Sequence, residues 1–149
     1  MSAVLLDTDV LVRLLHSADP LHATARKAVR ALRRQHDSFY VSIQNVAEFW
    51  NVCTRPTSAR NGLGIEPSEV EKRIATINRW TRVLTESEAS YAVWQRLVAT
   101  YSVRGASVHD ARLASVMIAN GISQILTFNG SHFARYELEV LNALNPASY

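Results

Sequence analysis

Short apolar runs alternate along the chain with longer segments whose apolar residues recur every three or four positions. The short runs predict β-strands and the longer segments predict amphipathic helices. The predicted strands are 4–6, 39–41, 83–84, 125–128 and 138–141. The predicted helices are 10–15, 20–34, 43–53, 67–80, 87–101 and 108–120. Strands that alternate with helices are typical of a parallel sheet covered on both faces, so the pattern predicts an α/β fold.

Residues with strong positional preferences mark the ends of several predicted helices. Asp19 followed by Pro20 predicts a helix that begins at Pro20, and Ser42 can cap the helix after the second strand. Gly121 predicts the end of the last helix. The connection 54–67 contains two prolines and two glycines, and a connection of this length is usually either functional or mobile.

Two helix faces need separate interpretation. Phe49 and Trp50 fall on the apolar side of helix 43–53, so we expect both side chains to pack in the core. Helix 20–34 directs basic residues outward, and this face is either a solvated surface or a stripe that contacts phosphates. The basic residues are Arg26, Lys27, Arg30, Arg33 and Arg34.

The composition fits a single domain over residues 1–149. With 48% hydrophobic residues and three tryptophans, the chain can bury a substantial core without a disulfide or a structural metal. Cys53 is the only cysteine, which excludes an intramolecular disulfide and a multi-cysteine zinc site and indicates a reducing compartment. No apolar run approaches the roughly 18 residues of a membrane span, and no secretory signal is visible, so we expect a soluble cytoplasmic protein.

The charge balance mildly favours a polyanionic partner. The formal net charge is +3 and the isoelectric point is near 9.4. Lys27 and Lys72 are the only lysines, so the basic residues are almost all arginine. Arginine suits phosphate because its guanidinium can donate two parallel hydrogen bonds.

Acidic and amide side chains lie near the carboxyl ends of the predicted strands. Asp7 directly follows the first strand, and Glu48 lies early in the helix after the second strand. Asp110 lies in the first turn of the last helix, and Asn129 directly follows the fourth strand. Open α/β sheets bind ligands at the carboxyl ends of their strands, so we expect these four side chains to meet at one edge.

Three carboxylates in one crevice repel each other and need a compensating positive charge. Carboxylate oxygens with water in the remaining positions suit Mg²⁺ or Mn²⁺, and the absence of a tight Cys/His set argues against zinc. Such an ion activates water and stabilises charge on a phosphodiester, which is nuclease chemistry. Each acid could instead cap or complement a helix N-terminus, but their common location favours the metal site.

Four segments of the chain resemble the four motifs of PIN-domain proteins. They are Val4–Val12, Gln44–Val52, Val108–Ala114 and Leu126–Phe133. The chain is similar to the VapC branch, which consists of toxins of bacterial toxin–antitoxin pairs that cleave RNA with Mg²⁺ or Mn²⁺. The resemblance implies a three-layer α/β/α sandwich with a mostly parallel sheet of about five strands, commonly dimeric. It also implies an antitoxin partner, for which the Phe49–Trp50 helix and the connection 54–67 are candidate docking surfaces.

The resemblance assigns roles by position. Asp7, Glu48 and Asp110 match the acidic metal-site residues of the family, and Asn129 matches its fourth position. We therefore expect these four residues to be catalytic and the three acids to bind the metal ion. The expected supporting residues are Thr8, Asp9, Thr127 and His132.

Two positions depart from the family pattern. Asp9 stands where asparagine is commoner, and His132 stands before Phe133 where aspartate is usual. The missing acid lowers the negative charge of the site and with it the expected metal affinity. His132 could contact a phosphate when protonated or could be an ordinary surface residue. The candidate RNA-binding residues near the rim are Arg55, Arg104 and Arg112.

The leading hypothesis is a metal-dependent endoribonuclease, and two alternatives stay open. A PIN domain weakened by the His132 departure would act as a module that binds RNA or an antitoxin. Residues 6–10 also resemble the opening motif of haloacid-dehalogenase-like phosphatases, whose first aspartate is a nucleophile. That chemistry needs a lysine near the site, whereas Lys27 and Lys72 lie within predicted helices.

Overall fold

Strands and helices alternate along the chain as the hydrophobic pattern predicts. A computed structural model describes residues 2–35, 38–146 and 149. Its strands are β1 (Ala3–Leu6), β2 (Ser38–Ser42), β3 (Arg82–Leu84), β4 (Gln124–Thr127) and β5 (Glu139–Asn142). Its helices are α1 (Thr8–Leu15), α2 (His22–Arg33), α3 (Ile43–Thr54), α4 (Pro67–Trp80), α5 (Glu88–Thr100) and α6 (Ser107–Ala119), with a 3-10 turn η1 (Gly130–His132). Within the described residues, no helix is long and apolar enough to span a membrane.

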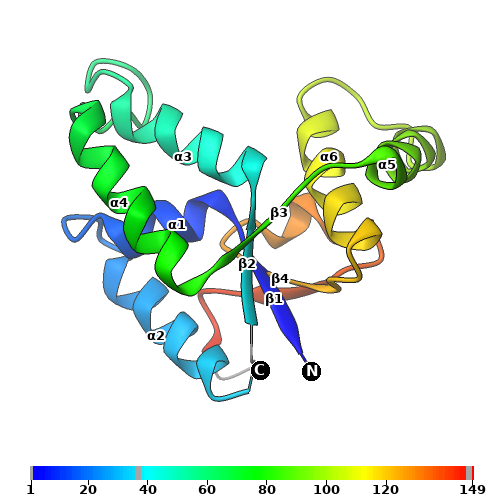
Figure 1. The fold of residues 1–149 in the computed structure, drawn as a ribbon, viewed down its shortest axis with the longest axis horizontal. Coiled ribbons are helices and arrows are strands. Elements are labelled where there is room, and N and C mark those ends of the chain that lie inside the picture. Colours follow the sequence, from blue (N-terminus) through cyan, green and yellow to red (C-terminus); the bar gives the residue numbers. More distant parts are fainter. Residues whose placement is uncertain (1, 36–37, 147–148) are drawn as a thin grey trace.

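The described strands form one parallel sheet in the order β3-β2-β1-β4-β5. In the central strand β1, Leu5 pairs with Tyr40 of β2 on one side and with Ile125 of β4 on the other. Figure 1 shows α1 to α4 on one side of the sheet and α5 and α6 on the opposite side. The architecture is therefore the expected three-layer α/β/α sandwich.

Each face of the sheet has its own hydrophobic core, because successive side chains of a strand point in opposite directions. Val4 and Leu6 pack with residues of α1 to α4, including the fully buried Phe49. Leu5 packs on the other face with Met117 of α6. Burial on both faces fixes the register of β1 and so fixes the position of the residues that follow it.

The chain reverses its direction across the sheet between β1 and β4. From β1 it passes outward through β2 to β3, and it then crosses back through α5 and α6 to β4 on the far side of β1. In an open α/β sheet such a reversal leaves a crevice at the carboxyl ends of the two neighbouring strands. The fold therefore has its expected ligand site at the ends of β1 and β4.

Two predictions about the helices are wrong. Helix α2 begins at His22 rather than at Pro20, because the Asp19 carboxylate accepts a hydrogen bond from the Leu21 amide (2.8 Å) and closes a turn before the helix. Trp50 is 38% exposed, although its neighbour Phe49 is fully buried. One residue along an α-helix turns the side chain by about 100°, so α3 can bury one of these rings and expose the other.

Backbone hydrogen bonds hold the connection after α3 against the end of that helix, where it forms one wall of a cleft. Backbone amides of residues 63–65 donate hydrogen bonds of 2.8 to 3.2 Å to carbonyls of residues 52–55. Gly62 lies so close to the preceding turn that a Cβ atom there would stand 2.0 Å from the Pro56 carbonyl oxygen. Only glycine fits this approach, and the wall that it completes borders the cleft at the end of β1.

Candidate active site

A cleft of about 480 Å³ opens at the carboxyl ends of β1 and β4. It brings together the four residues that the sequence places at this edge, which are Asp7, Glu48, Asp110 and Asn129. Thr8, Asp9 and His132 also line it. Asp7 at the end of β1, residues of α1, α3 and α6, and the segment after β4 thus converge, as the parallel topology requires.

Asp7 extends the end of β1 and also begins α1. Its amide donates to the Leu126 carbonyl (3.0 Å), which continues the pairing of β1 with β4. Its Oδ1 atom accepts from the Thr8 amide (2.8 Å), so the side chain caps α1. Its Oδ2 atom accepts from the Thr127 hydroxyl (2.8 Å). Each carboxylate oxygen has a second lone pair, so capping leaves acceptor capacity toward the cleft.

Hydrogen bonds from both sides orient Glu48. The Thr8 hydroxyl donates to Oε2 (2.8 Å), and Gln44 Nε2 donates to Oε1 (2.9 Å). Thr8 in turn accepts a hydrogen bond from Asn45 Nδ2 (3.2 Å), and Gln44 Nε2 also lies 2.9 Å from the His109 carbonyl oxygen. Helix α3 is thereby linked both to α1 and to the start of α6, and the Glu48 carboxylate is held in place before any ligand binds.

Asp9 connects α1 to the segment after β4. Its carboxylate accepts hydrogen bonds from the Phe128 amide (3.2 and 3.3 Å) and from Asn129 Nδ2 (2.8 Å). The Asn129 amide nitrogen of the backbone donates to the Thr127 hydroxyl (2.9 Å). Because the side-chain nitrogen of Asn129 donates to Asp9, the side-chain oxygen Oδ1 is the group that Asn129 can offer to a ligand in the cleft.

Asp110 lies in the first turn of α6, on the opposite side of the cleft. Its Oδ2 atom is 3.7 Å from His132 Nδ1, a distance that forms an ion pair when the imidazole is protonated. The His132 side chain is 55% exposed. A second hollow of about 570 Å³ shares Asp110 and His132 with the cleft and is also lined by Arg135. Asp110 therefore lies between two adjacent hollows.

Burial and mutual repulsion disfavour the charged forms of three carboxyl groups. Burial raises the pKa of Asp7 to about 7, and the charges of Asp9 and Glu48 act in the same direction against hydrogen bonds from Thr127 and Thr8. Burial also raises the pKa of Asp9, against the Phe128 hydrogen bond and the Arg13 charge. The pKa of Asp110 is raised by burial and by Glu48, although His132 opposes the shift. A cation in the cleft would relieve this cost.

The donor set fits a hard divalent cation. Asp7, Glu48 and Asp110 offer carboxylate oxygens from three sides of one cleft, and Asn129 offers an amide oxygen. Within the part of the chain that the structure describes, no three such side chains stand close enough to form a ready-made metal cage. This spacing matches an ion that keeps several of its waters, as Mg²⁺ usually does, better than a fully enclosed site.

Two arginines beside the cleft were not among the sequence predictions. Arg13 lines the cleft, with its guanidinium 4.5 Å from the centre of the Phe128 ring and Nε 3.7 Å from Asp19 Oδ1. Its spacing of four residues from Asp9 on one helix face could have indicated it. Arg135 borders the second hollow, and no sequence spacing could have indicated it because the turn after η1 has no regular period.

The three arginines predicted to contact RNA lie apart from these hollows. Arg55 donates to the Arg60 carbonyl (2.7 Å). Arg112 forms a two-point ion pair with Glu86, which lowers the pKa of that carboxyl group. Arg104 is exposed beyond the end of α5. None of the three is among the described residues that line the cleft, and their contact with RNA stays a prediction.

The fold and the site define a class of protein: a parallel α/β domain with an acidic cluster at the point where its strand order reverses. The chain belongs to the PIN domain family, because the family model matches residues 4–138. The similarity to PIN-domain proteins that four sequence segments indicate is thereby confirmed.

Individual relatives are ribonucleases and toxins of the VapC group. The chain is 28% identical over 119 residues to ribonuclease VapC48 of Mycobacterium tuberculosis, covering 80% of this chain and 82% of that protein. The crystal structure of M. tuberculosis VapC20, a toxin that cleaves the sarcin–ricin loop, matches with a TM-score of 0.63 and 22% identity over 88% of this chain and 93% of that chain. The crystal structure of VapBC2 from Rickettsia felis, bound to a DNA fragment from its promoter, matches with a TM-score of 0.68 and 13% identity. The match covers 94% of this chain and 98% of that chain.

Proposed function

We propose that this protein is a metal-dependent endoribonuclease that cleaves RNA phosphodiesters and is the toxin of a toxin–antitoxin pair. The observation that carries the proposal is the convergence of Asp7, Glu48 and Asp110 on one cleft. The similarity to VapC ribonucleases supports RNA as the substrate, since VapC48 is named as a ribonuclease.

In this proposal Asp7, Glu48 and Asp110 hold Mg²⁺ or Mn²⁺ directly or through waters, and the side-chain oxygen of Asn129 completes the site. A bound ion would supply a Lewis acid for the phosphodiester and a water of lowered pKa. The protein's own contribution is preorganisation. Thr8 and Gln44 fix the Glu48 carboxylate, so little reorganisation accompanies binding.

Basic side chains around the acids would orient the RNA backbone. His132 and Arg135 border the hollow beyond Asp110, while Arg13 borders the cleft on the α1 side. A strand that crosses Asp110 would therefore meet a positive charge on both sides of the reacting phosphate. Guanidinium groups suit this role because they donate paired hydrogen bonds to phosphate oxygens.

We also propose an antitoxin partner and a homodimer, as in the VapC group. The best surface for an antitoxin helix is an apolar hollow of about 400 Å³ lined by Ile43, Trp50, Ile74 and Val83. Ile43, Trp50 and Val83 are 54%, 38% and 43% exposed, and their grouping in one hollow marks a candidate contact surface. A toxin–antitoxin complex from Klebsiella pneumoniae shares the fold, with a TM-score of 0.62.

The test is cleavage of an end-labelled RNA panel by the purified full chain across Mg²⁺ and Mn²⁺ titrations. Asp110→Asn, purified identically, controls for contaminating nuclease, and Glu71→Gln on the exposed face of α4 controls for the loss of one charge. We expect metal-dependent cutting by the wild type and by Glu71→Gln, and none by Asp110→Asn. Equal cutting by Asp110→Asn would remove the carboxylates from the mechanism.

The alternative of a weakened, RNA-binding PIN domain is tested by His132→Asp. This substitution restores the acid that the family usually has before Phe133 and removes the imidazole that lies beside Asp110. If the wild type binds RNA but does not cut it, and His132→Asp cuts, the alternative is correct. Equal cutting by both proteins dismisses it.

A further inference from the structure

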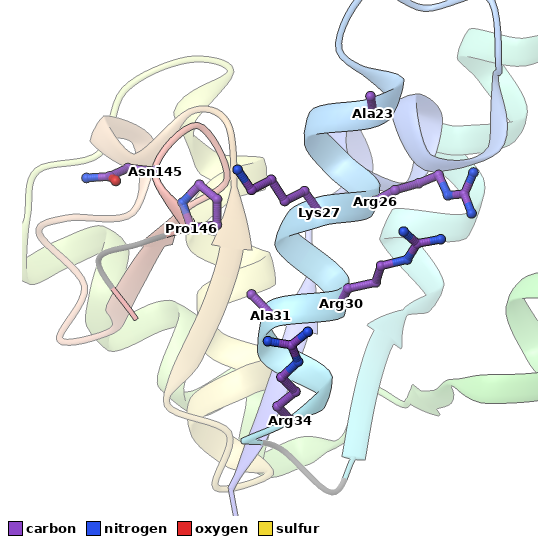
Figure 2. Close-up of a pocket in the computed structure, with 8 residues that line it drawn as sticks. All are labelled: Ala23, Arg26, Lys27, Arg30, Ala31, Arg34, Asn145 and Pro146. Carbon is purple, nitrogen blue, oxygen red and sulfur yellow. The ribbon is translucent and has the colours of Figure 1, made fainter.

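The outer face of α2 is a basic groove separate from the acidic cleft. Figure 2 shows Arg26, Lys27, Arg30 and Arg34 along this helix, with Lys27 directed toward Pro146 of the C-terminal segment. The groove has a volume of about 720 Å³ and is also lined by Asn145 and by small alanines of α2. All four basic residues are exposed. The concave shape distinguishes this surface from an ordinary solvated helix face.

The four cationic groups have no acidic partner among the described residues. No ion pair or side-chain hydrogen bond involves any of them there, whereas Arg13, Arg73, Arg96 and Arg112 each face a carboxylate. Helix α2 itself contains no aspartate or glutamate. The positive charge of the groove is therefore not neutralised by its own helix.

The spacing of these charges along α2 is unfavourable for the isolated helix, although basic residues in its last turn complement the helix dipole. Arg30 lies four residues from both Arg26 and Arg34 and three residues from Lys27, and like charges at these spacings destabilise a helix. A solvated face needs only occasional charge, and mixed signs would serve it better. A polyanionic ligand would convert this repulsion into binding energy.

The groove and the acidic cleft are joined by a short structural path. Arg13, which lines the cleft, accepts a hydrogen bond at its carbonyl oxygen from the His22 ring (2.8 Å). His22 begins α2, and Arg26 follows one turn later, about 6 Å along the helix axis. A ligand that extends from the cleft along α2 would meet Arg26, Arg30 and Arg34 in succession.

We propose that this groove binds the phosphodiester backbone of RNA outside the cleft, and so holds the part of a long substrate that does not react. The proposal rests on the ribonuclease function proposed above. A membrane surface fits less well, because the apolar face of α2 is buried in the core and the groove offers only alanines and Pro146 for insertion. Contacts from arginine and lysine to phosphate oxygens carry no sequence information, so we expect binding in the groove to be independent of RNA sequence.

Binding is tested with the full chain and a fluorescent 20-nucleotide single-stranded RNA in chelator, which prevents metal-dependent cutting. The stripe variant is Arg26→Gln, Arg30→Gln and Arg34→Gln. The control variant is Lys72→Gln, Arg79→Gln and Arg82→Gln on α4 and β3. Both lose three positive charges and fall from +3 to a formal net charge of zero, so total charge is matched.

Salt dependence separates a local contact from a general charge effect. Each phosphate contact with a single strand contributes about 0.7 to the slope of log affinity against log salt, so the stripe variant should lose about 2 from that slope. Because 0.1 M and 1 M salt differ tenfold, the ratio of wild-type affinity to stripe-variant affinity should be about 100-fold larger at 0.1 M salt than at 1 M salt. The control variant should keep the wild-type slope. Equal losses in both variants, or no loss in the stripe variant, would overturn the proposal.

Cleavage then distinguishes this proposal from the catalytic one. The stripe variant should cut a four-nucleotide RNA at the wild-type rate and a 20-nucleotide RNA containing the same site with a raised KM. If the wild type cuts neither RNA, the ribonuclease proposal has failed, and the binding slopes still decide the groove. Stripe-dependent binding to phosphatidylglycerol vesicles without stripe-dependent binding to RNA would assign the groove to a membrane and overturn the proposal. Melting temperatures of the wild type and the stripe variant should be similar, because the relief of like-charge repulsion offsets the loss of favourable charge at the C-terminus of α2.

Discussion

Asp7→Asn should stabilise the fold in the absence of metal while it removes activity. The substitution leaves the hydrogen bond from the Thr8 amide in place, because an amide oxygen accepts as a carboxylate oxygen does. The new NH₂ group can donate to the Thr127 hydroxyl. The Thr127 proton can then turn to Asp9 Oδ2, which lies 3.3 Å away. The hydrogen-bond network is thus preserved, and only the buried charge is lost.

The magnitude follows from the pKa of Asp7. Burial raises it from 3.8 to about 7 in the folded protein. A carboxyl group whose pKa is raised by folding binds its proton more tightly in the folded state, so its effect is absent below about pH 4 and grows until about pH 7. This rise in the pKa of Asp7 corresponds to a cost of about 4 kcal/mol to the free energy of unfolding at pH 8. Asparagine does not titrate and avoids this cost.

The assay is urea unfolding of the wild type and Asp7→Asn in chelator at several pH values. We expect the variant to exceed the wild type by about 4 kcal/mol at pH 8 and by less than about 1 kcal/mol near pH 4. Mn²⁺ should stabilise the wild type more than the variant, because only the wild type has the full set of acids. A variant less stable than the wild type at pH 8, or a difference that does not change with pH, would refute the reasoning.

Three further substitutions test the packing around the site. Thr8→Val removes the hydrogen bond that orients Glu48, and we expect a loss of about 1–3 kcal/mol in urea unfolding together with weaker Mn²⁺ binding by calorimetry; unchanged metal binding would contradict the orienting role. Gly62→Ala places a Cβ atom against the Pro56 carbonyl oxygen, so the variant should show faster amide hydrogen exchange in the connection after α3. An exchange rate equal to that of the wild type would show that the connection accommodates the Cβ atom without losing its hydrogen bonds. Phe49→Ala empties a fully buried site and should cost about 3–5 kcal/mol, whereas a cost below about 1 kcal/mol would mean that the core collapses around it.

Much of the candidate site follows from residue order alone. A residue at or just after the end of a strand must lie at the carboxyl edge of a parallel sheet. Asp7 directly follows β1, and Asn129 lies two residues after the end of β4. Helical spacing places Glu48 in the second turn of α3 and Asp110 in the first turn of α6. These positions depend on short-range geometry, which is why they could be predicted before the elements were placed in space.

The partners of individual side chains could not be predicted in this way. The pattern on α3 assigned Trp50 to the core, yet its exposure depends on which elements cover that side of the helix. The guanidinium group of Arg112 suits a phosphate contact, yet its position on α6 places it against Glu86. Arg135 carries no periodic signal, yet η1 and the following turn bring it beside Asp110.

The sequence by itself determined the types and order of the elements, the α/β class and the edge at which the acids gather. These features rest on the periods of 3.6 and 2 residues and on the directionality of parallel strands, which act over a few positions. Only the tertiary structure decided which carboxylates repel each other, which arginines face a carboxylate and which hollows lie beside the acids. Those outcomes depend on distances between segments as far apart as Asp9 and Asn129, and no local pattern encodes such distances.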